Sequence, residues 1–149
     1  MHLLKKKPFF NEAQSQEIIR SIKEAERMTS GEIRVFVEHH CRFVNAMDRA
    51  FEIFGKLQMH HTKHHNAVLV YLALKDRQFA ILGDEGIHQK VGDDFWKEEL
   101  TDLRKYFREN RFVDGIANCV LEIGESLKQY FPYESDGDNE LPDDIVYGR

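Results

Sequence analysis

The segment "NAVLVYLALKDRQFAILG", from Asn66 to Gly83, decides the fold of this 149-residue chain. Its first half is an almost unbroken apolar run, which is typical of a β-strand covered on both faces of its sheet. Three polar residues, Lys75–Arg77, then form a turn-sized gap before the apolar pattern resumes. The segment therefore predicts a β-hairpin with strands over residues 66–74 and 78–83.

The residues before this hairpin predict a mixed sheet. The alternating "EIRVFVE", Glu32–Glu38, indicates another strand, and apolar residues at helical spacing from Asn45 to about Leu57 indicate a helix. A strand, a helix and a buried strand in this order predict two parallel strands joined by a right-handed crossover. The hairpin then adds an antiparallel third strand.

Three further helices are predicted around this sheet. The first follows Asn11, an N-cap with Gln14 at capping-box spacing, and Gly31 is its stop signal. The others begin near Gly92–Asp93 and extend from Phe112 to Tyr130. We therefore expect the order αβαββαα and an α/β fold, a three-layer α/β/α sandwich with a small mixed sheet that is Rossmann-like.

Charge is distributed unevenly along the chain. Six of the 26 acidic residues lie in segment 133–149, which has one basic residue, whereas residues 1–132 hold 20 acidic and 20 basic side chains. A body without excess positive charge argues against nucleic acid as the main partner. We expect one domain over residues 1–132 and an acidic, flexible tail over 133–149 that contacts a protein partner.

The composition is that of a soluble globular domain, with 42% hydrophobic and 32% charged residues. No apolar run approaches the roughly 20 residues that a membrane span needs, and no stretch of signal-peptide length follows the basic start. Cys41 and Cys119 are isolated, without a CxxC pair. We expect a cytoplasmic protein without a membrane span, whose two cysteines are small, semi-buried side chains.

Four acidic residues follow the hairpin within a short stretch: Asp84, Glu85, Asp93 and Asp94. In the expected topology the two parallel strands begin at the sheet edge where the third strand ends. This rim also receives Glu32, Asn66 and the histidine-rich segment 60–65. Carboxylates on glycine-flanked loops are ligands that Ca²⁺ or Mg²⁺ binds. The sequence therefore predicts a weak divalent-cation site at the rim, with the four acids as ligands.

The same residues also have ordinary structural roles. Asp93 or Asp94 at a helix start would act as an N-cap, and "GDEG" after the hairpin is a competent turn. Glu32 and Arg34 share one strand face, so they either pair and orient a rim ligand or lie on a partly covered face. We interpret the paired histidines of segment 60–65 as structural, because no cysteine or carboxylate is fixed to them.

The sequence lacks the common motifs of phosphate chemistry. It contains neither of the patterns GxxxxGK[ST] and GxGxxG, and it has no C-x5-R, DxDx[TV] or GxSxG nucleophile motif. Hydrolysis would therefore have to use metal-bound water as the nucleophile. No general base for such a reaction can be named from the sequence.

Four segments resemble the TPM domain family: "TSGEIRVFVE" (Thr29–Glu38), "NAVLVYLALKDRQFAILGDEGI" (Asn66–Ile87), "VDGI" (Val113–Ile116) and "NELPDDIVYG" (Asn139–Gly148). The resemblance extends from about Phe9 to Phe131 and implies a three-layer α/β/α module. The last segment resembles the tail of short bacterial members that have no signal peptide or membrane anchor.

The resemblance also carries implications for function. Some members are described as weak acid phosphatases and others as accessory or assembly factors, and divalent-metal binding at an acidic loop recurs. It implies Asp84 as the first ligand, Asp93 and Asp94 behind it, and Glu32 as a support. We expect a metal-binding, non-catalytic module that acts through protein interaction. The alternative is a weak metal-dependent phosphomonoesterase.

Overall fold

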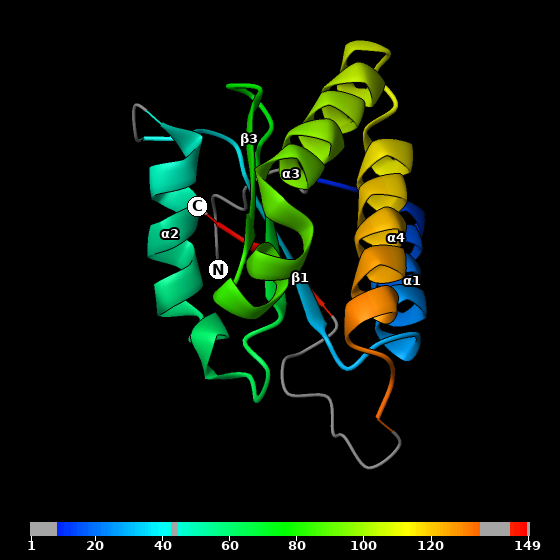
Figure 1. Cartoon of the computed structure of the whole chain (residues 1–149). Coiled ribbons are helices and arrows are strands. Elements are labelled where there is room, and N and C mark those ends of the chain that lie inside the picture. Colours follow the sequence, from blue (N-terminus) through cyan, green and yellow to red (C-terminus); the bar gives the residue numbers. More distant parts are fainter. Residues whose placement is uncertain (1–8, 43–44, 135–143, 149) are drawn as a thin grey trace, which may run out of the picture.

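The computed structural model describes residues 9–42, 45–134 and 144–148. Its elements are α1 (Glu12–Arg27), β1 (Glu32–Glu38), α2 (Ala46–Lys56), the 3₁₀ helix η1 (Met59–His61), β2 (Ala67–Ala73), β3 (Gln78–Gly83), α3 (Glu85–Arg108), α4 (Phe112–Tyr130) and β4 (Ile145–Tyr147). Figure 1 shows the sheet between helices. All seven predicted elements are present, and β4 is an additional strand.

The four strands form one mixed sheet in the order β3-β2-β1-β4. β1 and β2 pair in parallel, with Glu32 opposite Ala67 and Glu38 opposite Ala73. β3 pairs antiparallel with β2, as the hairpin predicted. Every residue of β1 and β2 is buried, which explains the unbroken apolar run of β2.

Helices cover both faces of the sheet. On one face α1, α3 and α4 pack against alternate strand residues such as Val35 and Val70. On the other face α2 and η1 pack against the intervening residues, which include Phe36 and Leu69. Successive side chains of a strand point to opposite faces, so each strand supplies both cores. The predicted three-layer α/β/α sandwich is confirmed (Figure 1).

Helix α3 begins earlier than the sequence predicted. Asp84 is its N-cap and Glu85 its first residue, so "GDEG" is a helix start and not a separate turn. Gly92, with φ 77° and ψ 175°, interrupts the helix, and a second helical segment follows it. The predicted start near Gly92–Asp93 is therefore this interruption inside α3. The earlier turn of helix is stabilised by Oδ1 of Asp84, which accepts a 2.8 Å hydrogen bond from the Glu85 N–H.

Strand β4 lies in the segment that was expected to be a flexible tail. It pairs in parallel with β1, with Ile145 opposite Val35, and Ile145 is buried in the core. The expectation is therefore wrong for Ile145–Tyr147, whereas residues 135–143 of the tail lie outside the described residues. The sequence did not reveal β4 because three residues are too few to show the alternation of apolar and polar residues that is typical of a strand.

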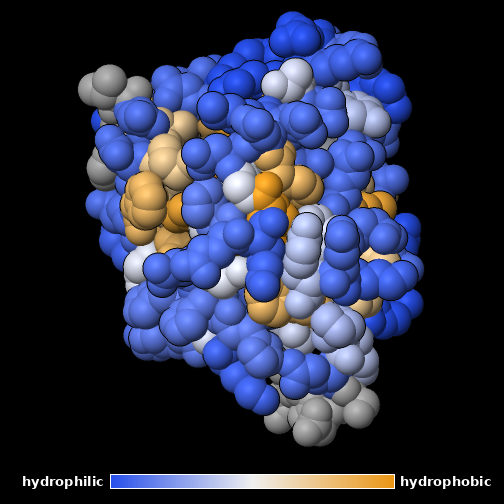
Figure 2. Space-filling model, viewed as in Figure 1, coloured by the Kyte–Doolittle hydropathy of each residue, from blue (hydrophilic) through white to orange (hydrophobic). Residues whose placement is uncertain are grey.

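The remaining general predictions concern cysteines and membranes. Both cysteines are free thiols; Cys119 is buried and Cys41 is half-buried. None of the helices in the described ranges has the length and apolarity that crossing a membrane requires. The face seen in Figure 2 is mostly hydrophilic, with hydrophobic areas that are small and separate. The cytoplasmic location stays a prediction.

Candidate cation sites

The starts of β1 and β2 and the end of β3 meet at one edge of the sheet, here called the rim. Two backbone hydrogen bonds join segments 65–67 and 84–86: the Asp84 N–H donates to the Ala67 carbonyl at 2.9 Å, and the Gly86 N–H donates to the His65 carbonyl at 2.8 Å. Glycine is required for this approach, because a Cβ at residue 86 would lie 2.6 Å from the His65 oxygen. The rim is therefore held by backbone contacts.

Two buried side-chain oxygens of the rim accept no hydrogen bond from the described residues, Oδ1 of Asn66 and Oδ2 of Asp84. Asn66 is fully buried and its amide nitrogen donates to Oγ of Ser30 at 3.3 Å. The Asp84 side chain is 14% exposed, and its other oxygen caps α3. A buried acceptor without a donor costs about 1–3 kcal/mol. Each of these oxygens is of a type that coordinates Ca²⁺ or Mg²⁺.

The ionisable side chain of His65 lies close to the buried Oδ2 of Asp84. Its Nδ1 lies 3.4 Å from Oδ2 of Asp84. Only a protonated imidazole would form an ion pair there, and a protonated His65 would compete with a cation for the same oxygen.

The predicted supporting residues Glu32 and Arg34 are both buried. The Glu32 N–H donates to the Asn66 carbonyl at 3.4 Å, so β1 begins at the rim as predicted. Burial lowers the pKa of Arg34, and the carboxylates of Glu26, Asp144 and Glu32 oppose this change. This face of β1 is therefore covered, and the guanidinium of Arg34 lies near three carboxylates.

The other predicted ligands do not join Asp84. Glu85 is exposed in the first turn of α3, and Asp93 and Asp94 are exposed beyond the interruption at Gly92. Oδ1 of Asp93 instead lies 3.4 Å from Nε2 of His88. Within the described ranges no set of three His, Cys, Asp or Glu ligand atoms gathers at the rim. The four-acid site is not preformed, and of the four acids only Asp84 has a buried oxygen that accepts no hydrogen bond from the described residues.

The histidine-rich segment makes ring contacts and acidic contacts of its own. The rings of His60 and His61 meet edge to face at 4.2 Å. Nε2 of His64 lies 2.6 Å from Oε1 of Glu134, just before the undescribed part of the tail. The contact between His64 and Glu134 connects the loop after η1 to the segment that follows α4.

A second acidic group, which the sequence analysis missed, lies between α3 and α4. One oxygen each from Glu99, Asp102 and Glu122 falls within 4.8 Å of the others, so this group could hold a cation. Glu99 is only 6% exposed. Burial and the nearby charges of Glu122 and Asp102 raise the pKa of Glu99 from 4.5 to about 8. The spacing of Glu99 and Asp102 on one helix was a visible signal, but the approach of Glu122 depends on helix packing.

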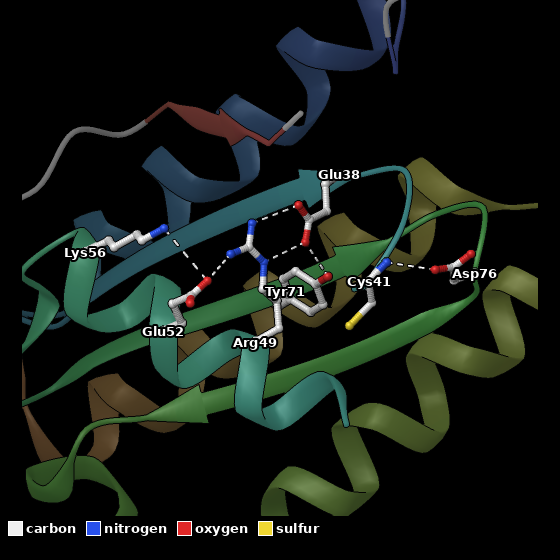
Figure 3. Close-up of polar contacts among 7 residues, drawn as sticks. All are labelled: Glu38, Cys41, Arg49, Glu52, Lys56, Tyr71 and Asp76. Carbon is white, nitrogen blue, oxygen red and sulfur yellow. Dashed lines mark hydrogen bonds and ion pairs between the residues drawn. The ribbon is translucent and has the colours of Figure 1, made fainter. Parts of the chain in front are cut away.

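A third polar cluster, at the carboxyl end of β1, is paired internally. Arg49 of α2 donates to both oxygens of Glu38, at 2.9 and 3.0 Å, and also pairs with Glu52. Figure 3 shows the Arg49 guanidinium between these two carboxylates. Nearby, the Cys41 N–H donates to Oδ2 of Asp76 at 2.8 Å. We interpret this cluster as a structural connection between α2 and the sheet.

Comparison with known proteins decides the family. The sequence pattern of the TPM domain matches residues 5–126, most of the chain. This chain belongs to the TPM domain family. The NMR structure of the BA42 protein from the psychrophilic bacterium Bizionia argentinensis is 37% identical, with a TM-score of 0.88, and the match covers 97% of this chain and 99% of that one.

A more distant solved structure shares the fold of this TPM domain. The N-terminal domain of the cg2496 protein from Corynebacterium glutamicum has a TM-score of 0.53 at 14% identity, over 98% of this chain and 94% of that one. At this identity the similarity concerns the fold alone. None of the curated proteins matches the sequence.

Proposed function

We propose that this TPM domain is a divalent-cation-binding module that acts through association with another protein and not through catalysis. The observation that carries the proposal is the pair of buried oxygens at the rim, Oδ1 of Asn66 and Oδ2 of Asp84, which lack hydrogen-bond donors among the described residues. Carboxylate and amide oxygens are ligands of Ca²⁺ and Mg²⁺. The residues at the rim therefore fit the cation that the TPM resemblance implies.

The rim would bind such a cation weakly. Asp84 would be the principal ligand and Asn66 the second, with water or backbone carbonyls completing the shell. Sites with so few charged ligands bind Ca²⁺ on the order of 10⁻⁴ to 10⁻³ M, and the looser geometry of Ca²⁺ favours it over Mg²⁺. Asp93 or Asp94 would join only after α3 pivots at Gly92, where its helical backbone is already interrupted.

Association is favoured over catalysis by the absence of a nucleophile motif from the sequence. The acidic segment 133–149 is the proposed contact with a protein partner, and β4 anchors one end of it to the sheet. A metal-dependent phosphomonoesterase is the alternative that the experiment has to separate.

The test is a Ca²⁺ titration followed by amide NMR. We expect shifts concentrated at residues 65–67 and 83–87, and we expect Asp84→Asn to abolish them. Asparagine is also a good N-cap, so this variant preserves the start of α3. Glu17→Gln, which removes an exposed carboxylate from α1, is the matched control and should keep the shifts. Unchanged amides at the rim at millimolar Ca²⁺ would overturn the cation site.

The same samples test catalysis with a chromogenic phosphate ester. We expect turnover near background at neutral pH, with or without Mg²⁺. Strong turnover that is lost in Asp84→Asn would establish the phosphomonoesterase instead.

A further inference from the structure

We infer that the contact between α3 and α4 holds a second, independent divalent-cation site, formed by Glu99, Asp102 and Glu122. It shares no residue with the rim. Its proposed ligand is a hard cation of the Ca²⁺ type.

The three carboxylates come from two helices that pack closely. Glu99 and Asp102 lie one turn apart on α3, and Glu122 reaches them from α4. Gly115 of α4 permits the approach, because a Cβ there would lie 2.7 Å from Cβ of Tyr106 on α3. Figure 1 shows the two helices connected by a short loop at one end. The acidic group is therefore produced by rigid helix packing and not by a flexible loop.

The burial of Glu99 distinguishes this group from an ordinary acidic surface. Glu99 is 6% exposed, and its Oε1 accepts no hydrogen bond within the described ranges. It nevertheless lies with two other carboxylates, all with ligand oxygens within 4.8 Å of one another. Beside like charges the ionised form of Glu99 is unfavourable unless a positive charge compensates it, and without one the carboxyl keeps its proton.

Among the described residues, the basic side chains near this group form no ion pair with it. Arg111 pairs with Glu109 and Asp114, at 3.6 and 3.3 Å. Lys105 forms no ion pair in the part of the chain that the structure describes. Glu99 is therefore compensated either by its own proton or by a cation from solution, which displaces that proton when it binds.

An open pocket gives a cation access to the group. The pocket has a volume of about 410 Å³, and its lining includes Asp102 and Glu122 together with the basic residues Lys105 and Arg111. Nδ2 of Asn118 donates to Oε1 of Glu122 at 3.1 Å, which orients that carboxylate. The pocket has room for the waters that would complete a coordination shell.

The ligand set favours Ca²⁺. Three carboxylates are hard oxygen ligands, which suit Ca²⁺, Mg²⁺ and Mn²⁺ better than softer metals. Ca²⁺ accepts six to eight oxygens in a flexible geometry, whereas Mg²⁺ demands a near-ideal octahedron, so three carboxylates completed by waters suit Ca²⁺ better.

The experiment is amide NMR of the full chain with CaCl₂ as the probe. In the wild type we expect shifts at residues 98–103 and 118–123, separate from those at the rim. The double variant Asp102→Asn/Glu122→Gln should weaken this response at least about tenfold, because two of the three charged ligands are lost, and should leave rim shifts unchanged. Both substituted residues are exposed, so the variant should fold.

Glu125→Gln is the matched control, since it removes an exposed carboxylate from the same helix. It should leave the response of α3 and α4 unchanged. Absence of shifts at 98–103 and 118–123 in the wild type, or their persistence at equal Ca²⁺ in the double variant, would overturn the site. Asp84→Asn should affect only the rim, so failure of one cation site is distinguishable from failure of the other.

Discussion

The phenol of Tyr71 donates a 2.5 Å hydrogen bond to Oε2 of Glu38, and both side chains are buried. Burial and the hydrogen bond to Glu38 raise the pKa of Tyr71, so the phenol stays protonated and remains a donor. With the two bonds from Arg49, the carboxylate receives donors from both α2 and β2 (Figure 3). A buried acid in this arrangement depends on each of its donors.

Tyr71→Phe should lower the free energy of unfolding by about 1–3 kcal/mol, because Glu38 stays buried and loses a donor. Urea unfolding measures the change. Tyr133→Phe is the control, since Tyr133 is 54% exposed, and it should change stability by less than about 0.5 kcal/mol. Equal effects of the two substitutions would mean that the hydrogen bond to Glu38 contributes nothing.

Two glycine substitutions should have opposite effects. Gly86→Ala would bring a Cβ within 2.2 Å of the His64 carbonyl oxygen, so the rim has to shift and the protein should be destabilised. Gly55→Ala, inside α2, meets no atom within 4 Å and should stabilise by about 0.5–1 kcal/mol, because alanine favours helix. Thermal unfolding of both variants gives the comparison. A stabilised Gly86→Ala would show that the contact at the rim is not tight.

Ile145→Ala should lower the free energy of unfolding by about 2 kcal/mol. This value is near the lower end of the range of about 2–5 kcal/mol for replacing a buried isoleucine by alanine. The side chain is buried in the core beside β1, but it lies on an edge strand that can relax. Removal of residues 144–149 should cost at least as much. If both proteins unfold at the wild-type denaturant midpoint, β4 does not contribute to stability and the whole tail is an appendage.

The contribution of Glu99 to the stability of the metal-free protein should fall as pH rises from about 4.5 to about 8. The pKa of Glu99 is about 8 in the folded state against its ordinary 4.5. Between these pH values the unfolded chain releases the proton of Glu99 whereas the folded protein keeps it, so rising pH stabilises the unfolded chain relative to the folded protein. Glu99→Gln should remove this pH dependence and become the more stable protein above pH 8. Denaturant unfolding in a chelator measures the difference, with the exposed Glu98→Gln as the control. Parallel curves for wild type and Glu99→Gln would contradict the raised pKa.

The sequence predicted elements best where a local pattern determines them. The capping box of Asn11 and Gln14 and the helix predicted from Asn45 to about Leu57 are present, and the apolar run of β2 is buried on both faces. β4 was missed because its strand conformation comes from pairing with β1. The start of α3 was missed because Gly92 looks like a boundary, although helical residues lie on both sides of it.

The candidate sites show the same division. Topology alone placed Glu32, Asn66 and Asp84 at one rim, because strand direction determines which ends meet. It could not show that Asp93 turns away with the second part of α3. The group of Glu99, Asp102 and Glu122 forms only when α3 packs against α4. Residue spacing within one helix does not reveal such a contact.

The two pairings of β1 differ greatly in their separation along the chain. Val35 lies opposite Val70, 35 residues later, and opposite Ile145, 110 residues later. Pairing across a longer loop carries a larger entropic cost and forms more slowly. β4 is therefore expected to dock after the other three strands have assembled. Contacts formed after the folding transition state act mainly on the unfolding rate, so the C-terminal strand would determine how long the folded state persists more than how quickly it forms.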